Sequence, residues 1–251
     1  MVSEAVSAPD LSSRVALVTG ASRGIGRAIA LALAEAGASV AVNYRARAHD
    51  ADEVVARIRA LGRQAIAVGA DVSVRSSVLA MVAEVERALG PVDVLVNNAG
   101  IAVGGGGDIV SEDDFDRTIA VNLKSAFLCI EAVLPRMRTR HWGRIVNISS
   151  AAARGGGLVG AHYNAAKAGL EGLTRGYASR LAQAGITVNA VAPGPVETEM
   201  AEPLRQSGIA DRIPLRRFGR PDEIAQAVLM VLGNDFITGQ TIPVNGGLLF
   251  V

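Results

Sequence analysis

The chain has 251 residues, of which half are hydrophobic, and its formal net charge at pH 7 is +1. This length suits one α/β domain, and the balanced charge excludes a broad basic field for nucleic acid or for anionic lipid. The single cysteine, Cys129, excludes an internal disulfide and suits a reducing compartment, and no apolar stretch reaches the roughly 18 residues of a membrane span, so we expect a cytoplasmic protein without membrane contact.

The first thirteen residues contain Glu4 and Asp10 and no apolar stretch. They lack the features of a signal peptide, and we expect a flexible polar tail. From residue 14 to residue 251, strand-like and helix-like segments alternate without a linker or a repeat, which predicts a single domain. Strands are expected at residues 15–18, 38–43, 64–69, 92–97, 143–149, 186–191 and 240–244, and helices at 27–36, 50–61, 74–89, 111–138, 162–183 and from 221 onward.

This alternation predicts a parallel sheet, because parallel strands need a crossover helix between them. We expect a Rossmann-type doubly wound α/β domain, with seven parallel strands and helices on both faces of the sheet. Ligands of such sheets bind beyond the carboxyl ends of the strands. Gly20, Asn97, Ser150 and Pro193 lie at or just past expected strand ends, so a binding site is expected there.

A glycine-rich turn follows the first expected strand, at residues 19–26. Its glycines, Gly20, Gly24 and Gly26, have the spacing G-x-x-x-G-x-G. Glycine lets the backbone turn sharply and approach a pyrophosphate, and the free N–H groups at a helix N-terminus favour an anion. Strand, glycine turn and helix in this order predict a dinucleotide-binding unit; the alternative is an ordinary glycine turn.

A phenol and an amine are one helical turn apart in the helix expected at residues 162–183. Tyr163 and Lys167 are four residues apart, and Ser150 lies thirteen residues before the tyrosine. Residues i and i+4 are neighbours on a helix, so the Lys167 ammonium would lie beside the Tyr163 ring. Since an unperturbed tyrosine has a pKa of about 10, a nearby positive charge would bring the pKa of Tyr163 toward the range useful for proton transfer.

Together with Asn97-Asn98-Ala99-Gly100 and Pro193-Gly194, these motifs resemble the short-chain dehydrogenase/reductase family, over residues 14 to 247. Within that family the chain looks most like the 3-oxoacyl-acyl-carrier-protein reductase branch. The resemblance implies an NADP-dependent oxidoreductase that reduces a ketone to a secondary alcohol. The implied substrate is a 3-oxoacyl thioester, carried on acyl-carrier protein or on CoA. The same fold also supports non-catalytic regulators, which are expected to have lost the tyrosine or the lysine.

The resemblance implies catalytic roles for Asn122, Ser150, Tyr163 and Lys167. Tyr163 would donate a proton to the substrate carbonyl oxygen as hydride arrives from the nicotinamide, and Ser150 would stabilise the charge that develops on that oxygen. Lys167 would lower the pKa of Tyr163 and bind the nicotinamide ribose, and Asn122 would hold a water that links Lys167 to solvent. Two alternatives stay open: Ser149 in place of Ser150, and a purely structural Asn122.

The end of the second strand bears on the choice of nicotinamide cofactor. NAD-preferring enzymes carry Asp or Glu there, whereas this chain has Asn43-Tyr44-Arg45. Arg45, with Ser22 and Arg23, would hold the 2′-phosphate of NADP(H), because a guanidinium binds phosphate through paired hydrogen bonds. The alternative is that Arg45 and Arg47 only solvate a loop. The residues expected at the cofactor are Gly20, Ser22, Arg23, Gly24, Ile25, Gly26, Asn43, Tyr44, Arg45, Asp71, Val72, Asn98, Ala99, Gly100, Tyr163, Lys167, Pro193, Gly194, Val196 and Thr198.

A separate set of residues bears on the substrate. An acidic carrier protein would need a basic surface, and four arginines offer one: Arg136, Arg138, Arg140 and Arg144. The alternative is that these arginines only stabilise the end of the preceding helix. The chain departs from the reductase branch at Ala184, where a basic residue is common, at Arg180, where an acid is common, and in a short stretch at 232–236. The alternative activity is an NADPH-dependent ketone reductase or secondary-alcohol dehydrogenase for a small non-thioester compound.

Two further segments are expected to cover the site and to join subunits. Residues 195–217 would form a flap with an apolar lining that includes Met200, Leu204 and Ile209. The resemblance implies a homotetramer, and the apolar ending at residues 246–251 would be buried between subunits.

Several residue types carry no expected chemistry. The histidines His49, His141 and His162 are scattered, so no metal site is expected. His162 would either line the pocket or lie at the surface. Cys129 is expected in the core, and residues 104–107 are expected to form a flexible loop.

Overall fold

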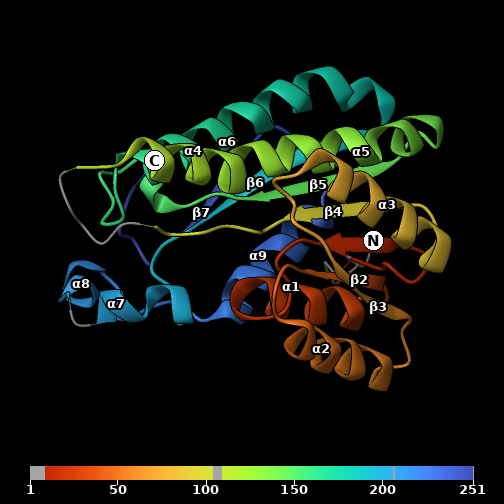
Figure 1. Ribbon diagram of the computed structural model, residues 1–251, viewed down its shortest axis with the longest axis horizontal. Helices are drawn as coiled ribbons and strands as arrows, with labels where there is room; N and C mark the ends of the chain where they lie inside the picture. Colours follow the sequence, from red (N-terminus) through yellow and green to blue (C-terminus); the bar gives the residue numbers. More distant parts are fainter. Residues whose placement is uncertain (1–8, 104–108, 206, 251) are drawn as a thin grey trace, which may run out of the picture.

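The computed structural model describes residues 9–103, 109–205 and 207–250. Within these residues, seven strands form one parallel sheet in the order β3-β2-β1-β4-β5-β6-β7 (Figure 1). This arrangement confirms the expected Rossmann-type doubly wound fold. The strands are β1 (Val15–Val18), β2 (Ser39–Tyr44), β3 (Ala65–Gly69), β4 (Val94–Asn97), β5 (Gly143–Ile148), β6 (Ile186–Pro193) and β7 (Thr241–Val244).

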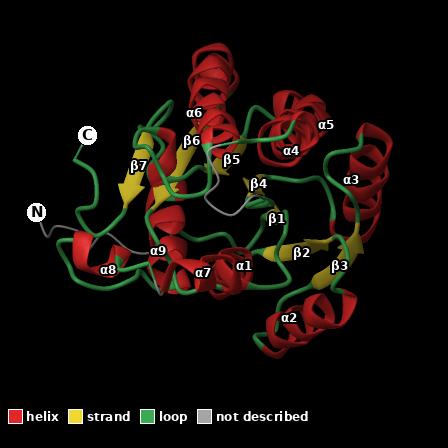
Figure 2. Cartoon of the chain, turned by 60° about the vertical axis from the view of Figure 1, so that its left-hand side comes forward, coloured by secondary structure: helices red, strands yellow, loops and turns green. Residues whose placement is uncertain are grey.

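Helices cover both faces of the sheet (Figure 2). One face carries α1 (Gly24–Glu35), α2 (Ala48–Ala60) and α9 (Pro221–Leu232). The other face carries α3 (Arg75–Leu89), α4 (Glu112–Ile119), α5 (Ser125–Thr139) and α6 (Ala161–Leu181). The segment after β6 forms η4 (Glu199–Ala201), α7 (Glu202–Arg205) and α8 (Ile209–Arg212).

The core consists of two apolar clusters, one on each face of the sheet. Successive strand residues point to opposite faces, so Val18 packs in the cluster with α1, α2 and α9. Its neighbour Leu17 packs in the cluster with α3, α5 and α6. Both faces of each inner strand are therefore buried, which explains why the strands are continuous apolar runs rather than alternating ones.

The helical run from Glu112 to Thr139 is interrupted by a π-turn, η1 (Ala120–Lys124). The sequence predicts one continuous helix here, and its expected start is correct, because the Ser111 hydroxyl accepts from the Asp114 N–H at 3.1 Å. By length and composition the run could cross a membrane, but half of its apolar window is buried inside the protein. Leu128 and Ile130 belong to the core, so this is a core helix of the domain.

The strand order reverses at β1, which pairs with β2 on one side and with β4 on the other. Loops that leave the carboxyl ends of these strands run in opposite directions and leave a crevice between them. The glycine turn follows β1, and Asn98 follows β4. The fold thus places both motifs at the crevice.

Packing begins before residue 14, the expected start of the domain. Leu11 is only 4% exposed and belongs to the core, and its N–H donates to Ala36 O at 2.8 Å. A single apolar residue among polar neighbours gives no periodic pattern, so the sequence does not reveal this contact. The expected loop at 104–107 and the last residue, Val251, lie outside the described residues.

Candidate active site

A cleft of about 1220 Å³ opens at the carboxyl ends of the strands. Its walls come from the glycine turn, the end of β2, the turns after β3, β4 and β5, the start of α6 and the segment after β6. Every residue expected at the cofactor lines this cleft, and so does Ser150. The sequence motifs, which are far apart in the chain, therefore meet at one site.

The glycine turn has a backbone that only glycine adopts easily. Gly20 and Gly24 have φ angles of 62° and 54°, in the region that L-residues rarely occupy. A Cβ at Gly26 would collide with Gly20 O and with the Asn98 side chain. Asn98 Nδ2 donates to Thr19 O at 2.9 Å and to Gly20 O at 3.0 Å, which fixes the turn against β4.

This turn fits the pyrophosphate of a nicotinamide dinucleotide. The turn leads directly into α1, so the first N–H groups of α1 lie at the cleft. Within the described part of the chain, the Arg23 side chain does not cap these groups. Free N–H groups at a helix N-terminus bind anions, and the absence of a Cβ at three glycines lets a phosphate approach the backbone.

At the end of β2, Asn43 holds the glycine turn in place. It is 2% exposed, its Oδ1 accepts from the Gly20 N–H at 3.1 Å, and its Nδ2 donates to Val68 O at 3.2 Å. Asn43 is therefore a structural link between β2, β3 and the turn. Arg45 is half exposed, with Nη1 3.9 Å from Asp71 Oδ2.

Asp71, one of the residues expected at the cofactor, is itself held by its neighbour Ser73. Asp71 Oδ1 accepts from Ser73 Oγ at 2.5 Å and from the Ser73 N–H at 2.9 Å. These hydrogen bonds lower the pKa of Asp71, against the opposing effect of partial burial. The carboxylate is thus kept ionised, as an acceptor at the cleft wall.

The side chains expected to be catalytic converge from the turn after β5 and from α6. Tyr163 and Lys167 occupy the first two turns of α6, and Lys167 Nζ lies 5.7 Å from the centroid of the Tyr163 ring. Lys167 is buried, and its Nζ donates to Ile148 O at 2.8 Å. Ser150 lies two residues after the end of β5 and is hydrogen-bonded with Tyr163. Serine, phenol and amine therefore form one contiguous group.

Burial dominates the pKa values of this group. It raises the pKa of Tyr163, while the hydrogen bond with Ser150 acts in the opposite direction. It also lowers the pKa of Lys167 to about 8, because a dry environment disfavours the ammonium. The structure thus does not show the expected lowering of the Tyr163 pKa by Lys167. The sequence could not predict this, because residue spacing does not show how completely a site is buried from solvent.

Asn122 lies in the π-turn and is 2% exposed. Its Oδ1 accepts from the Ile101 N–H at 2.8 Å, and its Nδ2 donates to Ile101 O at 2.9 Å. A Cβ at Gly100 would lie 3.4 Å from Asn122 Oδ1 and 3.6 Å from Lys167 Nζ, so both polar groups flank Gly100. Asn122 is behind the cleft wall rather than on it, because it is absent from the lining of the cleft.

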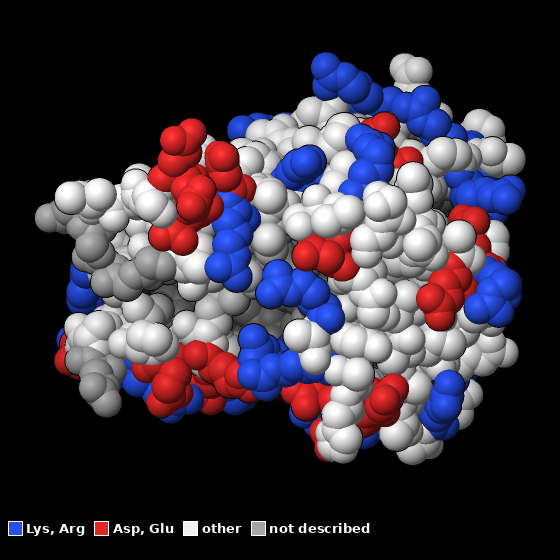
Figure 3. Space-filling model, in the orientation of Figure 1, with Lys and Arg blue, Asp and Glu red and all other residues white. Residues whose placement is uncertain are grey.

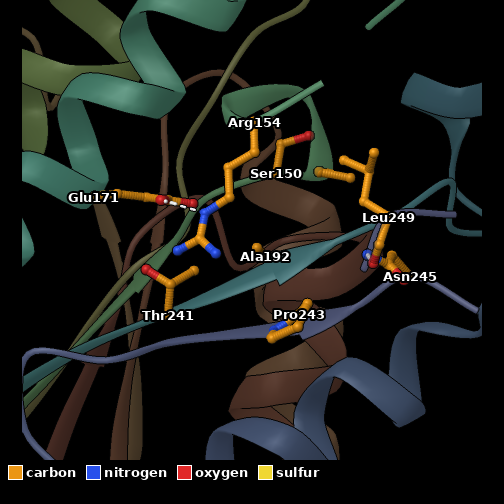
Figure 4. A pocket seen from close by; sticks show the side chains of 9 residues that line it. Ser150, Arg154, Glu171, Ala192, Thr241, Pro243, Asn245 and Leu249 are labelled. Carbon is orange, nitrogen blue, oxygen red and sulfur yellow. Dashed lines mark hydrogen bonds and ion pairs between the residues drawn. The ribbon is translucent and has the colours of Figure 1, made fainter. Parts of the chain in front are cut away.

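Ser149 and Ser150 have different surroundings. Ser149 is 3% exposed, and its Oγ lies 3.2 Å from Lys167 O and 3.4 Å from Glu171 Oε1, so it joins β5 to α6. Behind Ser150, Arg154 Nε donates to Glu171 Oε2 at 2.9 Å, across a small pocket (Figure 4). The hydroxyl at position 149 is thus bound to the scaffold, whereas the one at 150 faces the tyrosine.

The end of β6 and the segment after it also line the cleft, through Pro193, Gly194, Val196 and Thr198. A Cβ at Gly194 would lie 2.9 Å from Asn245 Cα, so glycine is required where β6 passes the turn after β7. Val196 forms an isolated parallel bridge with Gly219. The flap expected at 195–217 thus starts from a fixed point, and its apolar residues Met200, Leu204 and Ile209 line the cleft as expected.

Two of the four arginines expected to bind a carrier protein, Arg140 and Arg144, pair with acids of this chain. Arg144 is 5% exposed, with Nη2 2.7 Å from Asp235 Oδ1 and its guanidinium carbon 4.4 Å from the centroid of the Trp142 ring. Arg140 Nη2 lies 2.7 Å from Asp93 Oδ1. Because β5 begins at Gly143 and ends before Ser150, Arg140 and Arg144 lie at the amino end of this strand, opposite to Ser150. They are not at the mouth of the cleft.

The remaining expectations concern Cys129, the histidines and metals. Cys129 is fully buried in the core, and burial raises the pKa of its thiol to about 12, which agrees with a core role. His162 neither lines the cleft nor reaches the surface: it is 2% exposed, with Nε2 2.8 Å from Val103 O. Among the described residues, no three His, Cys, Asp or Glu side chains lie together as metal ligands would.

Comparison with known proteins gives a consistent result. Residues 14–208 match the family model for short chain dehydrogenase. The chain is 45% identical over 241 residues to 3-oxoacyl-[acyl-carrier-protein] reductase FabG of Staphylococcus epidermidis, covering 94% of this chain and 99% of that protein. It is 45% identical over 242 residues to 3-oxoacyl-[acyl-carrier-protein] reductase of Synechocystis sp., covering 95% and 98%.

A solved structure, a dehydrogenase/reductase from Sinorhizobium meliloti 1021, superposes with a TM-score of 0.88 at 37% identity, covering 96% of this chain and 97% of that one. Similar sequence over nearly the whole length and similar architecture agree with the glycine turn and the Ser150–Tyr163–Lys167 group described above. The chain therefore belongs to the short-chain dehydrogenase/reductase family, and is an oxidoreductase that acts on CH–OH groups and the corresponding carbonyls.

Proposed function

We propose that the protein reduces a 3-oxoacyl thioester to its 3-hydroxyacyl product with NADPH. The observation that carries this proposal is the convergence of Ser150, Tyr163 and Lys167 on a cleft that also contains the glycine turn. The choice of a thioester rests on the two curated relatives, whose names state reduction of 3-oxoacyl groups on acyl-carrier protein.

Each member of the group has a distinct task in this reaction. Bound NADPH supplies the hydride. The Tyr163 hydroxyl donates a proton to the substrate carbonyl oxygen, and the Ser150 hydroxyl hydrogen-bonds the same oxygen and stabilises its developing charge. Lys167 Nζ lies 5.7 Å from the centroid of the Tyr163 ring, and when it is protonated its charge favours loss of that proton. Asn122 holds the turn at Ile101 beside Lys167, and binds a water on the path by which Lys167 is resupplied with protons.

The preference for NADP(H) over NAD(H) is part of the proposal. Support comes from the guanidinium groups of Arg23, Arg45 and Arg47, which all line the cleft near the end of β2. An adenosine 2′-phosphate needs such cations, whereas a free ribose hydroxyl pair is usually bound by an acid at the end of this strand. In this chain β2 ends at Tyr44, whose side chain has no carboxylate.

A second candidate is an NADPH-dependent reductase of small ketones. It is favoured by the position of Arg140 and Arg144, which lie away from the cleft and pair with acids of this chain. The apolar flap residues Met200 and Leu204 line the cleft and suit a ketone as readily as an acyl chain.

The deciding experiment compares NADPH oxidation with acetoacetyl-CoA and with cyclic and aromatic ketones at matched concentrations. A higher kcat/KM for the thioester is the expected result; turnover of simple ketones alone would contradict the thioester proposal and support the second candidate. Tyr163→Phe is the catalytic control, and should lower kcat by about 10²- to 10⁴-fold, the usual contribution of a general acid, while NADPH binding persists. Full activity of this variant would contradict the proposed chemistry for both substrates.

We also infer a homotetramer and a cytoplasmic location. The tetramer is supported by the family resemblance and by exposed aromatic residues on the long helical run, Phe115 (44%) and Phe127 (36%), and sedimentation at the mass of one subunit would contradict it. The cytoplasmic location is supported by a single, buried, free cysteine, because a reducing compartment does not select for disulfides; recovery of the protein outside the cytoplasm on cell fractionation would contradict it.

A further inference from the structure

One acidic side chain of the flap, Glu199, contacts two arginines that line the cofactor cleft. Arg47 Nη2 donates to Glu199 Oε2 at 3.0 Å and Arg47 Nη1 donates to Oε1 at 3.3 Å. Arg23 Nη1 donates to the same Oε2. The three residues come from the glycine turn, the loop before α2 and the start of η4. Acidic and basic side chains are seen together between α7 and α1 in Figure 3.

The position of this contact indicates which ligand the arginines serve. Arg23 and Arg47 lie beside the end of β2, where dinucleotide-binding units hold the adenosine ribose. A carboxylate and a phosphate accept the same paired hydrogen bonds from a guanidinium. The Glu199 carboxylate thus accepts from Arg23 and Arg47 the same kind of hydrogen bonds that a 2′-phosphate would accept.

We propose that Glu199 competes with the 2′-phosphate of NADP(H) for Arg23 and Arg47, and so sets how strongly the phosphorylated cofactor is preferred. This inference rests on the NADP(H) cofactor of the proposed function. A ligand without the 2′-phosphate leaves the arginines on Glu199, whereas a ligand with it must separate them and lie close to a carboxylate. Glu199 therefore weakens binding of the phosphorylated cofactor alone.

The size of the effect follows from the exposure of the pair. The Arg23, Arg47 and Glu199 side chains are 48%, 47% and 60% exposed, so solvent screens the attraction between them and each contact is weak. Thr198, next to Glu199, packs near the glycine turn, since a Cβ at Gly24 would lie 3.3 Å from Thr198 Cγ2. This neighbour keeps the carboxylate close to the arginines, and both ion pairs must break together.

The test uses adenine nucleotides that report on the phosphate site without catalysis. Isothermal titration calorimetry would measure the Kd of 2′,5′-ADP and of 5′-AMP for the wild type, for Glu199→Gln and for Glu202→Gln. Glu202 is a matched control, because it lies on the same flap, is 69% exposed and pairs with Arg205 instead. We expect Glu199→Gln to bind 2′,5′-ADP about three- to tenfold more tightly, as loss of a competing carboxylate implies. Binding of 5′-AMP, and both ligands with Glu202→Gln, should change less than about twofold.

Three results would overturn the proposal. Unchanged or weaker binding of 2′,5′-ADP by Glu199→Gln means that Glu199 does not compete, or instead orients the arginines. An equal gain for 5′-AMP, or an equal gain in Glu202→Gln, means that only the overall charge matters. If neither the wild type nor Glu199→Gln binds 2′,5′-ADP better than 5′-AMP, the NADP(H) assignment fails together with the competition. If the wild type prefers 2′,5′-ADP and Glu199→Gln behaves as wild type, the competition alone fails.

Discussion

At the scale of single residues, the site is governed by how completely its amine is removed from water. Lys167 is buried and its one hydrogen bond within the described structure is to Ile148 O. A backbone carbonyl neutralises an ammonium only in part, so the folded protein favours the uncharged amine more than the unfolded chain does. Burial accordingly lowers the pKa of Lys167 from its ordinary 10.5 to about 8.

This burial makes the stability of the protein without cofactor depend on pH. Below about pH 8 the lysine is charged in both states, and the penalty for burying its charge is fully present. Between about pH 8 and 10.5 the unfolded chain binds more protons, so the penalty is relieved as the pH rises. Lys167→Met removes the titration. The difference in unfolding free energy between wild type and Lys167→Met should therefore move in favour of the wild type by about 1.4 kcal/mol per pH unit across this range.

Urea unfolding at pH 7.5, 8.5 and 9.5 and matched protein concentration would measure this difference. Lys124→Met serves as the control, because Lys124 is exposed and its substitution should give a difference that does not change with pH. The same constant difference for Lys167→Met would show that the buried lysine does not titrate in this range.

The proximity of Tyr163 and Lys167 could be predicted from sequence because it is local. Tyr163 and Lys167 share one helix, and four residues of spacing suffice to place them side by side. The contacts of Glu199 could not be predicted in this way, since it lies 152 residues from Arg47 and 176 from Arg23, and only the folded sheet brings the three together. The direction of the Tyr163 pKa was also missed, because it depends on burial by many residues.

At the scale of elements, the turn after β5 is fixed to α6 by one buried ion pair. Glu171 is 4% exposed, and Arg154 reaches it from the residue that follows η2 (Ala151–Ala153). Ser150 is the N-cap of η2, and its Oγ accepts from the Ala152 N–H at 3.1 Å. The ion pair thus holds the far end of the short turn, and the near end of that turn carries Ser150, the serine proposed to be catalytic.

Glu171→Gln should destabilise the protein by about 1–3 kcal/mol. This is less than the roughly 3–5 kcal/mol for breaking a fully buried pair, because the Arg154 side chain is 38% exposed and can turn to water. Chemical denaturation would give the value, with Glu202→Gln as an exposed acid whose loss should cost less than about 0.5 kcal/mol. Equal stability of Glu171→Gln and wild type would show that the pair contributes nothing.

Helix and strand types were predicted correctly along the chain, since periods of hydrophobicity depend on the nearest residues. The π-turn at Ala120–Lys124 was not. An extra residue in a helical turn leaves the apolar stripe nearly continuous, so the pattern of Val121, Ala126 and Ile130 reads as one helix. The interruption matters because it lies where Asn122 meets the site, and π-turns are often found at functional positions.

At the scale of the whole molecule, the fold could be predicted from the alternation of elements. The start of the domain and the position of the arginines relative to the cleft could not. The seven-stranded order is the arrangement expected for such a chain. Two conclusions needed the folded structure. Only the strand directions show that Arg140 and Arg144 are at the end of β5 opposite to Ser150, and only the packing shows that the domain includes Leu11.

Leu11→Ala should lower the unfolding free energy by about 2–3 kcal/mol, near the lower end for a buried leucine, because the N-terminal segment can partly close the gap. Leu61→Ala, at a leucine that is 45% exposed, is the matched control and should cost less than about 1 kcal/mol. Thermal or chemical unfolding of both variants measures the contrast. Two variants of equal stability would place the start of the domain after Leu11.

The surroundings of Trp142 decide what the intrinsic fluorescence of this protein reports. It is the only tryptophan of the chain, and its ring lies between two guanidinium groups, with Arg14 Cζ 3.7 Å and Arg144 Cζ 4.4 Å from its centroid. These residues flank the amino ends of β1 and β5, across the sheet from the cleft. Its emission therefore reports on folding and suits the unfolding experiments above. Nucleotide binding has to be followed by calorimetry or by the absorbance and fluorescence of the nicotinamide.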